Sequence, residues 1–451
     1  MLSIEDILKS TRGKLISGKR KTVFTDVSTD SRTIKKGSLF IPLTGPNYDG
    51  HKFIETAFSK GAKGVITAKK LANIPADKTV IYVKDSLKAF HQIARAYKER
   101  YSIPFIGITG SSGKTTTKDM LASILSSTGR TLKTEENYNN EIGVPKTLLT
   151  LNKTHKYAVI EMAMQGPGEI KALAWIVQPD IAVLTNIGSA HLECLKSVEN
   201  TAKAKSEILE FQKKEDIAIL PADDKFFNYL KKKAKGRIVS FGIDSQADVS
   251  AKNIRFHADS SSFDIETKSF KLSIDLPLPG KHNIYDALAA AAAAFAANIK
   301  PAQIKKGLEN FKLSSKRLNI IHFKGFKIID DTYNANPDSM AASLSVLENH
   351  PSRRIAVLGD MLELGAIARK SHENIGKLAA NLNIEALIAV GNLSKYAAKS
   401  AKTSGLKNIY SVRSNKEALK ILKRMIKPGD TLLIKGSRGM RMENIVAGLT
   451  K

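Results

Sequence analysis

The stretch GITGSSGKTTT, Gly107–Thr117, constrains the fold of this chain more than any other segment. It follows the apolar run IPFI and leads into TTTKDMLASILSS, whose apolar residues recur at helical spacing. A strand, a glycine turn and a helix in this order form a phosphate-binding loop, because backbone N–H groups and the positive end of the helix face an anion. The segment therefore predicts an α/β domain that binds a nucleotide.

The spacing of this loop departs from the standard form. Gly-x4-Gly-Lys-Thr would require a glycine at the position of Ile108, whereas the first glycine is Gly110. Gly110 and Gly113 still allow backbone N–H groups to face a phosphate. Lys114 is expected to neutralise β/γ-phosphate charge, and the Thr115 hydroxyl to bind Mg²⁺. The predicted ATP-binding residues of the loop are Gly110, Ser111, Ser112, Gly113, Lys114, Thr115 and Thr116.

Two further side chains are candidates for the metal of a triphosphate site, which needs hard oxygen ligands. Glu161 ends the strand-like run YAVIE, and His191 follows the run IAVLTNIG by a short turn. Both can reach the loop from neighbouring strand ends. On pattern alone, Glu161 can also be a capping acid, a single histidine is more often structural, and Lys205 is typical of a solvated helix face.

The chain has 451 residues, too many for one ordinary core, and its pattern separates into three segments. Residues 1–98, 99–312 and 313–451 each alternate short apolar runs with helical ones. Strands that end in Asp, Asn or Gly-Ser put polar groups where open α/β sheets bind ligands. The longest apolar run, Ala287–Ala297, is shorter than the ~20 residues of a membrane span and predicts a buried helix.

Charge and cysteine content restrict the class of protein further. The formal net charge is +28, but the lysines are scattered, and the densest cluster, Lys231–Arg237, contains no aromatic residue that could stack a base. We therefore do not expect nucleic acid as a partner. The single cysteine, Cys194, forbids an intrachain disulfide, and the N-terminus lacks a signal-peptide pattern. Together these features predict a cytoplasmic protein.

The motifs together resemble one family. The loop, with TEENYNNEIGVPKTLL, EMAMQGPGEI, TNIGSAHLE and AKAKSEI, resembles the Mur ligases, whose ATP loop has this shortened form. Four further stretches narrow the resemblance: TDSRTIKKGSLFIP near the N-terminus, and DDTYNANPDSM, VLGDMLELG and LLIKGSRG near the C-terminus. They are similar to the branch that adds D-alanyl-D-alanine to UDP-MurNAc-tripeptide. The resemblance covers essentially the whole chain.

The resemblance implies an α/β protein of three domains. Residues 1–98 would form an N-terminal α/β domain that binds the UDP-MurNAc-peptide. Residues 99–312 would form a central P-loop ATPase-type domain with a mostly parallel sheet, and residues 313–451 a Rossmann-like domain that binds the incoming dipeptide. It also implies an enzyme that uses ATP and Mg²⁺ to phosphorylate a carboxylate, which the dipeptide amine then attacks. We expect the chain to be a monomer. Domain closure is expected, because ATP and the dipeptide bind to different segments.

Site residues follow from the same resemblance. Lys205 matches a lysine that many members carry as a carbamate, Arg317 an arginine that reaches the γ-phosphate, and Asn283 an adenine-side asparagine. The contact of Asp286, where the family often has a second asparagine, stays open. The implied catalytic residues are Lys114, Lys205, His191 and Arg317. The implied metal site is Thr115, Glu161, His191 and Lys205. The resemblance also implies that Asp331 binds ATP. The implied substrate-binding residues are Ser31, Arg32, Asn137, Asn139, Asn140, Asn334, Asn336, Lys435 and Arg438.

Several alternatives stay open at this stage. The nearest is the ligase that adds the third amino acid to a UDP-MurNAc-dipeptide, although the tetrapeptide Asp-Asn-Pro-Arg typical of its diaminopimelate-adding members is absent. Folylpolyglutamate synthetases lack this kind of N-terminal domain. A nucleic-acid-binding P-loop ATPase would use the +28 charge. A protein that binds a nucleotide without catalysis would not need Lys114, Glu161 and Lys205 together. Lys435 and Arg438 can equally form a basic surface loop.

Overall fold

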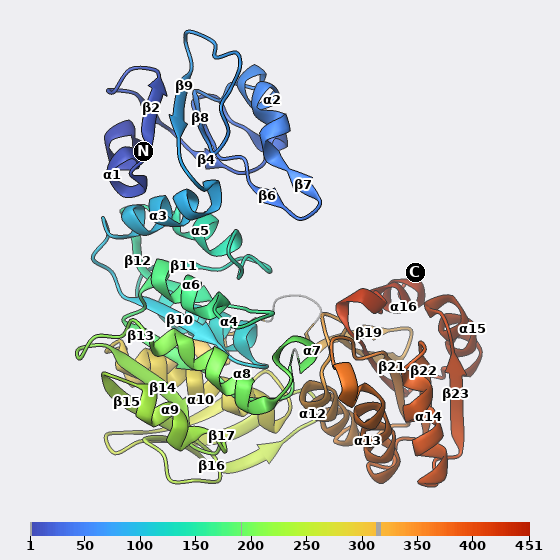
Figure 1. Cartoon of the computed structure of the whole chain (residues 1–451). Helices are drawn as coiled ribbons and strands as arrows, with labels where there is room; N and C mark the ends of the chain where they lie inside the picture. Colours follow the sequence, from blue (N-terminus) through green and yellow to red (C-terminus); the bar gives the residue numbers. More distant parts are fainter. Residues whose placement is uncertain (1, 191, 313–316) are drawn as a thin grey trace.

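The computed structural model describes residues 2–190, 192–312 and 317–451, and its strands form three main sheets (Figure 1). The N-terminal sheet is parallel except for its edge strand β2, and its order is β2 (Lys14–Ser17), β9 (Thr79–Tyr82), β8 (Gly64–Thr67), β5 (Leu39–Phe40) and β4 (Val27–Ser28). Two short antiparallel pairs accompany it, β1 (Leu2–Ser3) with β3 (Val23–Phe24) and β6 (Thr44–Gly45) with β7 (Tyr48–Asp49). Its helices are α1 (Ile4–Thr11), α2 (Ile54–Ser59) and α3 (Ser86–Lys98).

The central sheet has nine strands, in the order β11 (Arg130–Lys133), β12 (His155–Glu161), β10 (Phe105–Thr109), β13 (Ile181–Leu184), β14 (Ile217–Pro221), β15 (Arg237–Gly242), β16 (Val249–Phe256), β17 (Ser261–Glu266) and β18 (Lys271–Leu276). The pairs from β11 to β16 are parallel, and the last two are antiparallel. The sheet is therefore mostly parallel, as predicted.

Helices cover both faces of the central sheet, as the near-continuous apolar strands require. One apolar layer contains α4 (Lys114–Ser126), α10 (Lys281–Ala296) and α11 (Pro301–Glu309). The other contains α5 (Gly143–Leu148), α6 (Glu169–Val177), α8 (Val198–Ser206) and α9 (Phe227–Lys233). The alanine run of α10 is buried, which confirms the predicted core helix. No helix in the described ranges combines the length and apolar composition of a transmembrane span.

The C-terminal sheet has six strands, in the order β19 (Asn319–Phe323), β20 (Phe326–Asp331), β24 (Thr431–Lys435), β21 (Arg354–Gly359), β22 (Ala386–Val390) and β23 (Asn408–Val412). Only the β19–β20 pair is antiparallel. Its helices are α12 (Pro337–Glu348), α13 (Ala368–Asn381), α14 (Ser394–Thr403), α15 (Asn415–Met425) and α16 (Glu443–Leu449). The short helix α7 (Leu192–Leu195) lies between this sheet and the central one (Figure 1).

Candidate active site

The glycine-rich loop lies at a point where the strand order of the central sheet changes direction. Strand β10 pairs in parallel with β12 on one side and β13 on the other. The carboxyl ends of three strands therefore meet, which is where open α/β sheets bind ligands. This topology brings the loop after β10, Glu161 at the end of β12, and Thr185–Asn186 after β13 to one place.

Neighbouring side chains leave no room for a Cβ atom at either glycine of the loop. Gly113 caps the N-terminus of α4 with φ 77°, a left-handed conformation, and a Cβ there would lie 2.0 Å from Asp286 Oδ1. A Cβ on Gly110 would lie 1.8 Å from Thr185 Oγ1. The loop is therefore pressed between β13 and α10, and no larger residue fits at either position.

Two lysines meet at the loop, Lys205 buried and Lys114 half-buried. Lys114 Nζ and Lys205 Nζ each donate a hydrogen bond of 2.8 Å to the carbonyl oxygen of Gly110. Burial lowers the pKa of Lys114. Burial and repulsion by Lys114 hold the pKa of Lys205 well below its ordinary value. Lys205 is therefore not on a solvated helix face, and its burial favours the neutral form of the amine.

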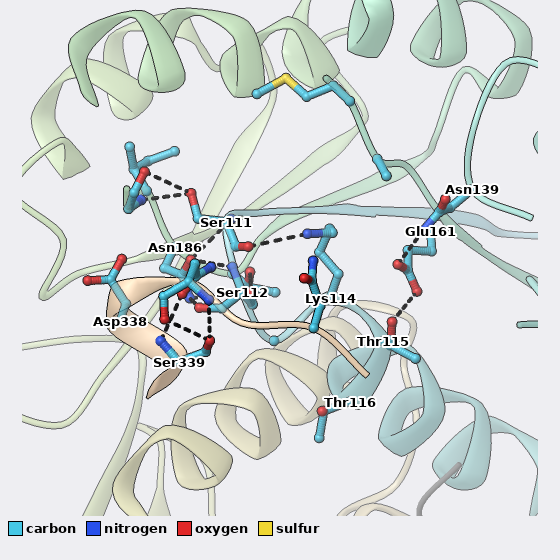
Figure 2. A pocket seen from close by; sticks show the side chains of 18 of the residues that line it. Ser111, Ser112, Lys114, Thr115, Thr116, Asn139, Glu161, Asn186, Asp338 and Ser339 are labelled. Carbon is cyan, nitrogen blue, oxygen red and sulfur yellow. Dashed lines mark hydrogen bonds between the residues drawn. The ribbon is translucent and has the colours of Figure 1, made fainter. Parts of the chain in front are cut away.

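Glu161 is buried, with an exposed fraction of 1%, and faces the start of α4 (Figure 2). Its two carboxylate oxygens accept hydrogen bonds of 2.8 Å from Thr115 Oγ1 and Asn139 Nδ2. A carboxylate beside a hydroxyl is the oxygen donor set that Mg²⁺ prefers. Among the described residues, no group of three or more His, Cys, Asp and Glu side chains is placed to hold a metal by itself. The predicted ligand His191 lies outside the described residues.

A cleft of about 1510 Å³ opens over the loop and is lined by both the central and the C-terminal parts of the chain. It brings together most of the predicted site residues, namely Ser111, Ser112, Gly113, Lys114, Thr115, Thr116, Asn137, Asn139, Asn140, Glu161, Asn283, Arg317, Asp331, Asn334, Asn336 and Lys435. Gly110 and Lys205 are not among the lining residues, and Lys205 contacts the loop at the Gly110 carbonyl. Ser31, Arg32 and Arg438 are not among the residues that line the cleft.

The C-terminal side of the cleft is built on two neighbouring strand ends. Asp331 of β20 and Lys435 of β24 are register partners, and their side chains form a buried ion pair. Burial opposes ionisation of Asp331, but the Lys435 ammonium outweighs it, so the pKa of Asp331 is lowered. Lys435 Nζ also donates to the Asn334 carbonyl at 3.0 Å. Lys435 is therefore fixed within the cleft rather than on a basic surface loop.

The remaining C-terminal candidates have structural partners. Asn336 caps α12 by accepting a hydrogen bond from Ser339 N at 2.8 Å. Arg438 reaches Glu443 with its side chain, while its backbone N–H donates to Asn334 Oδ1 at 3.3 Å. The guanidinium of Arg317 lies 3.8 Å from the ring centre of Tyr333, a cation–π contact that orients it at the cleft.

Two polar residues of α10 lie beside the loop. Asn283 Nδ2 donates to the Pro279 carbonyl at 2.7 Å. Asp286 is buried against Gly113, and its Oδ1 accepts a long hydrogen bond of 3.4 Å from Thr117 Oγ1. Burial raises the pKa of Asp286 to about 8, against the opposing effects of Thr117, Arg317 and Lys114. Asp286 can therefore stand protonated at the loop near neutral pH.

The N-terminal candidates lie elsewhere. Ser31 is buried in a short 3₁₀ turn (Ser31–Thr33), and Arg32 is exposed and pairs with Asp30 at 2.8 Å.

Asn140, at the cleft, accepts a hydrogen bond from Gly143 N at 2.9 Å and so fixes the start of α5.

The structure adds two residues that the sequence did not single out. Asn186 binds backbone N–H groups of the loop (Figure 2). Asp338 accepts a hydrogen bond from Ser189 N at 3.1 Å. Asn186 directly follows a buried strand next to the loop, so its position at a strand end was a usable signal. Asp338 reaches the loop region from α12, and no local pattern indicates that contact.

Three features define a nucleotide-binding P-loop protein with a second sheet facing its site: the loop between β10 and α4, the adjacent Lys114 and Lys205, and Glu161. Residues 108–294 match the Mur ligase middle domain, residues 316–438 the glutamate ligase domain of Mur ligases, and residues 23–98 the catalytic domain of the Mur ligase family. The chain belongs to the Mur ligase family, which confirms the resemblance found in the sequence.

Individual relatives agree with this assignment over the full length. The UDP-N-acetylmuramoyl-tripeptide–D-alanyl-D-alanine ligase of Bacillus subtilis is 35% identical over 452 residues, which cover 99% of this chain and 98% of the relative. A crystal structure of MurF from Acinetobacter baumannii has a TM-score of 0.93 at 34% identity, covering 99% of this chain and 98% of that one. The MurF ligase from Thermotoga maritima in complex with ADP has a TM-score of 0.83 at 27% identity, covering 94% and 97%.

Proposed function

We propose that the chain is an ATP-dependent ligase that joins D-alanyl-D-alanine to UDP-MurNAc-tripeptide and so forms the UDP-MurNAc-pentapeptide of peptidoglycan precursor synthesis. One observation carries this proposal. A single cleft combines the phosphate-binding loop and Glu161 with the Asp331–Lys435 pair of another sheet. Such a cleft can hold ATP, an acceptor carboxylate and an amine together. The identity of both substrates follows from the activity named for the relatives.

The chemistry addresses the low reactivity of a carboxylate. The terminal carboxylate oxygen of the tripeptide attacks the γ-phosphorus of ATP, and ADP leaves. The dipeptide amine then attacks the carbonyl carbon of the resulting acyl phosphate, so that an amide bond forms and inorganic phosphate departs with the C–O bond electrons. Lys114, Arg317 and the N–H groups at the start of α4 neutralise charge on the transferring phosphoryl group. The enzyme contributes mainly by positioning its substrates.

Each part of the chain has a proposed role. Residues 1–98 bind the UDP-sugar, with Ser31 and Arg32 in that site. Residues 99–312 bind ATP through the loop, Thr116 and Asn283. Residues 313–451 bind the dipeptide through Asn334, Asn336, Lys435 and Arg438, with Asp331 near the nucleotide. Asn137, Asn139 and Asn140 contact the muramoyl-peptide. A cytoplasmic location and a monomeric state remain predictions.

A magnesium ion and a modified lysine complete the proposed site. Thr115 and Glu161 fit Mg²⁺ because they place a hydroxyl and a buried carboxylate beside the loop, and His191 is proposed to assist them. When bound, Mg²⁺ would neutralise phosphate charge. The depressed pKa of Lys205 supports a carbamate there, because a neutral amine adds to CO₂ and releases one proton. The resulting anion would lie beside Lys114 and remove the repulsion between the two amines.

Replacement of Lys205 tests the carbamate. We expect Lys205→Ala to lose most activity, because the negative group beside the metal is absent, and a small carboxylate such as formate or acetate to restore part of it. The measurement is phosphate release with and without added carboxylate. Full activity of Lys205→Ala without rescue would show that no carbamate is needed.

The decisive experiment measures phosphate release from ATP with UDP-MurNAc-tripeptide, with and without D-Ala-D-Ala. We expect release to require both peptides and the pentapeptide to appear by mass spectrometry. Lys114→Ala should abolish turnover and serves as the inactive control. Turnover with UDP-MurNAc-dipeptide and a free amino acid would instead favour the preceding ligase, and release stimulated by nucleic acid alone would favour the ATPase alternative.

A further inference from the structure

Thr185 and Asn186, which follow β13, hold the ATP loop through hydrogen bonds to its two serines. The backbone N–H groups of Ser111 and Ser112 both donate to Asn186 Oδ1, at 3.1 and 3.0 Å. In return, Asn186 Nδ2 donates to Ser112 Oγ at 3.0 Å and to the Ser112 carbonyl at 3.3 Å. Thr185 Oγ1 donates to the same carbonyl at 2.5 Å. Figure 2 shows Asn186 lying against both serines.

This arrangement compensates for the shortened loop. Only Ser111 and Ser112 stand between the two glycines, so the loop cannot wrap around a phosphate as the longer standard loop does. The N–H groups that remain for the anion are those at the start of α4, which have no partner within the helix. Their residues, from Gly113 to Thr116, line the cleft. Their position depends on how the two serines are held.

We propose that Asn186 is a positioning residue for the triphosphate. Its carboxamide stays on Ser111 and Ser112 when the nucleotide binds, and so it directs Lys114 and the α4 N-terminus at the phosphates. The inference deepens the proposed function, because it concerns the ATP site of that reaction.

The side-chain chemistry explains why an amide suits this position. The Ser111 and Ser112 N–H groups need an acceptor, and the Ser112 carbonyl and hydroxyl oxygens take a donor, so one uncharged carboxamide satisfies all of them. A carboxylate would keep the acceptor but would place a negative charge beside the phosphates. An alanine would remove this acceptor from the Ser112 N–H, whereas the Ser111 N–H would keep its second hydrogen bond of 3.1 Å to the backbone carbonyl of residue 186.

Two substitutions and a matched control test the proposal. The variants are Asn186→Ala and Asn186→Asp. The control is Asn408→Ala, which removes an exposed asparagine whose one side-chain hydrogen bond goes to the Glu385 carbonyl, on the C-terminal sheet. The measurements are the Kd for ADP by titration calorimetry, the KM for each of the three substrates, and thermal unfolding.

We expect Asn186→Ala to raise the KM for ATP and the Kd for ADP about tenfold, the change that about 1.4 kcal/mol produces. The KM values for the two peptide substrates should stay within about twofold, since loss of one polar contact acts locally. Asn186→Asp should fold like the original chain and raise the Kd for ADP by at least as much. That rise should shrink in high salt, because the added charge is screened.

Unchanged ADP affinity in either variant would overturn the proposal, and so would equal rises of all three KM values, which indicate a general structural loss. If Asn186→Ala fails to unfold cooperatively, the salt-dependent ADP affinity of Asn186→Asp decides. The ADP titration needs no turnover. If the original chain binds ADP but releases no phosphate with the peptides, the proposed function fails while the role of Asn186 is still tested.

Discussion

The chain has two junctions between its sheets, and they are built from different interactions. Helix α3 joins the N-terminal sheet to the central one through an apolar cluster that is continuous across both. The C-terminal sheet has apolar clusters of its own, and among the described residues polar contacts and ion pairs connect it to the central part.

The first junction is a core. Phe90 and Ile93 of α3 are buried in the same cluster as Leu148 of α5 and Leu173 of α6. Tyr97 Oη adds a buried hydrogen bond of 2.9 Å to the Leu151 carbonyl. Because apolar burial grows with area and has no direction, moving these parts against each other would expose the whole surface to water at once.

The second junction consists of separate polar contacts. Ser189 N donates to Asp338 Oδ2 at 3.1 Å, Glu193 N donates to the Glu363 carbonyl at 3.1 Å, and the Lys327 ammonium lies 2.8 Å from Asp259. Water can replace each contact at small cost. The comparison teaches that the site lies at the junction held by polar contacts, and we predict that this junction opens and closes as the three substrates bind.

Removal of one core side chain at the first junction should have the largest effect on stability. Phe90 is 1% exposed, and we expect Phe90→Ala to reduce the free energy of unfolding by about 3–5 kcal/mol, through lost burial and the cavity that remains. Chemical denaturation monitored by circular dichroism measures this. A loss below about 1 kcal/mol would mean that α3 is not part of a shared core.

Ligands should move only the second junction. In a Cys194→Ser background, spin labels at Lys52→Cys and Lys233→Cys report the first junction, and labels at Lys233→Cys and Lys423→Cys report the second. We expect an ATP analogue with UDP-MurNAc-tripeptide to shift the second distance by several ångströms and leave the first unchanged, because only polar contacts must rearrange. The measurement is double electron–electron resonance. A change in the distance across the first junction alone would show that the first junction, and not the second, responds to ligands.

A titratable group at the second junction should make stability depend on pH. The pKa of Asp286 rises from the ordinary value of 3.8 to about 8. Between these values the native state keeps a proton that the unfolded chain has released, so stability falls as pH rises through this window. Asn at this position cannot ionise. Asp286→Asn should therefore gain Tm at pH 8 relative to pH 5, compared with the original chain. Three pH units at about 1.4 kcal/mol each set an upper bound of about 4 kcal/mol, which corresponds to roughly 8–16 °C.

Calorimetry at the two pH values measures this difference. Lys423→Ala, an exposed substitution on α15, is the control and should show no such dependence. An equal Tm difference at both pH values would mean that Asp286 is ionised throughout.

Loss of a single ion pair at the second junction should have the smallest effect. Lys327 and Asp259 are partly exposed, with side-chain exposures of 24% and 44%. We expect Lys327→Ala to cost less than about 1 kcal/mol of unfolding free energy, because an exposed pair gains little over water and is screened by salt. Denaturation of Lys327→Ala beside Lys423→Ala measures this cost. A cost similar to that of Phe90→Ala would remove the distinction between the junctions.

The sequence by itself determined the parts of the protein that depend on neighbours along the chain. The strand–loop–helix order at Gly107–Thr117 predicted the phosphate-binding fold, and the polar ends of apolar strands predicted Glu161 and Asp331 at sheet edges. Parallel strands place their carboxyl ends together, so these local patterns carried over to the structure.

Only the tertiary structure decided which of these ends face one another. Lys205 has the local pattern of a solvated helix face, yet it is buried against Gly110 because α8 packs under the loop. Asn186 and Asp338 reach the loop region from elements that are distant in the sequence. The local spacing of apolar and polar residues therefore could not predict their contacts. The pKa values of Lys205 and Asp286 likewise depend on burial and on charges brought near by folding, and a residue's neighbours in sequence do not fix either of these.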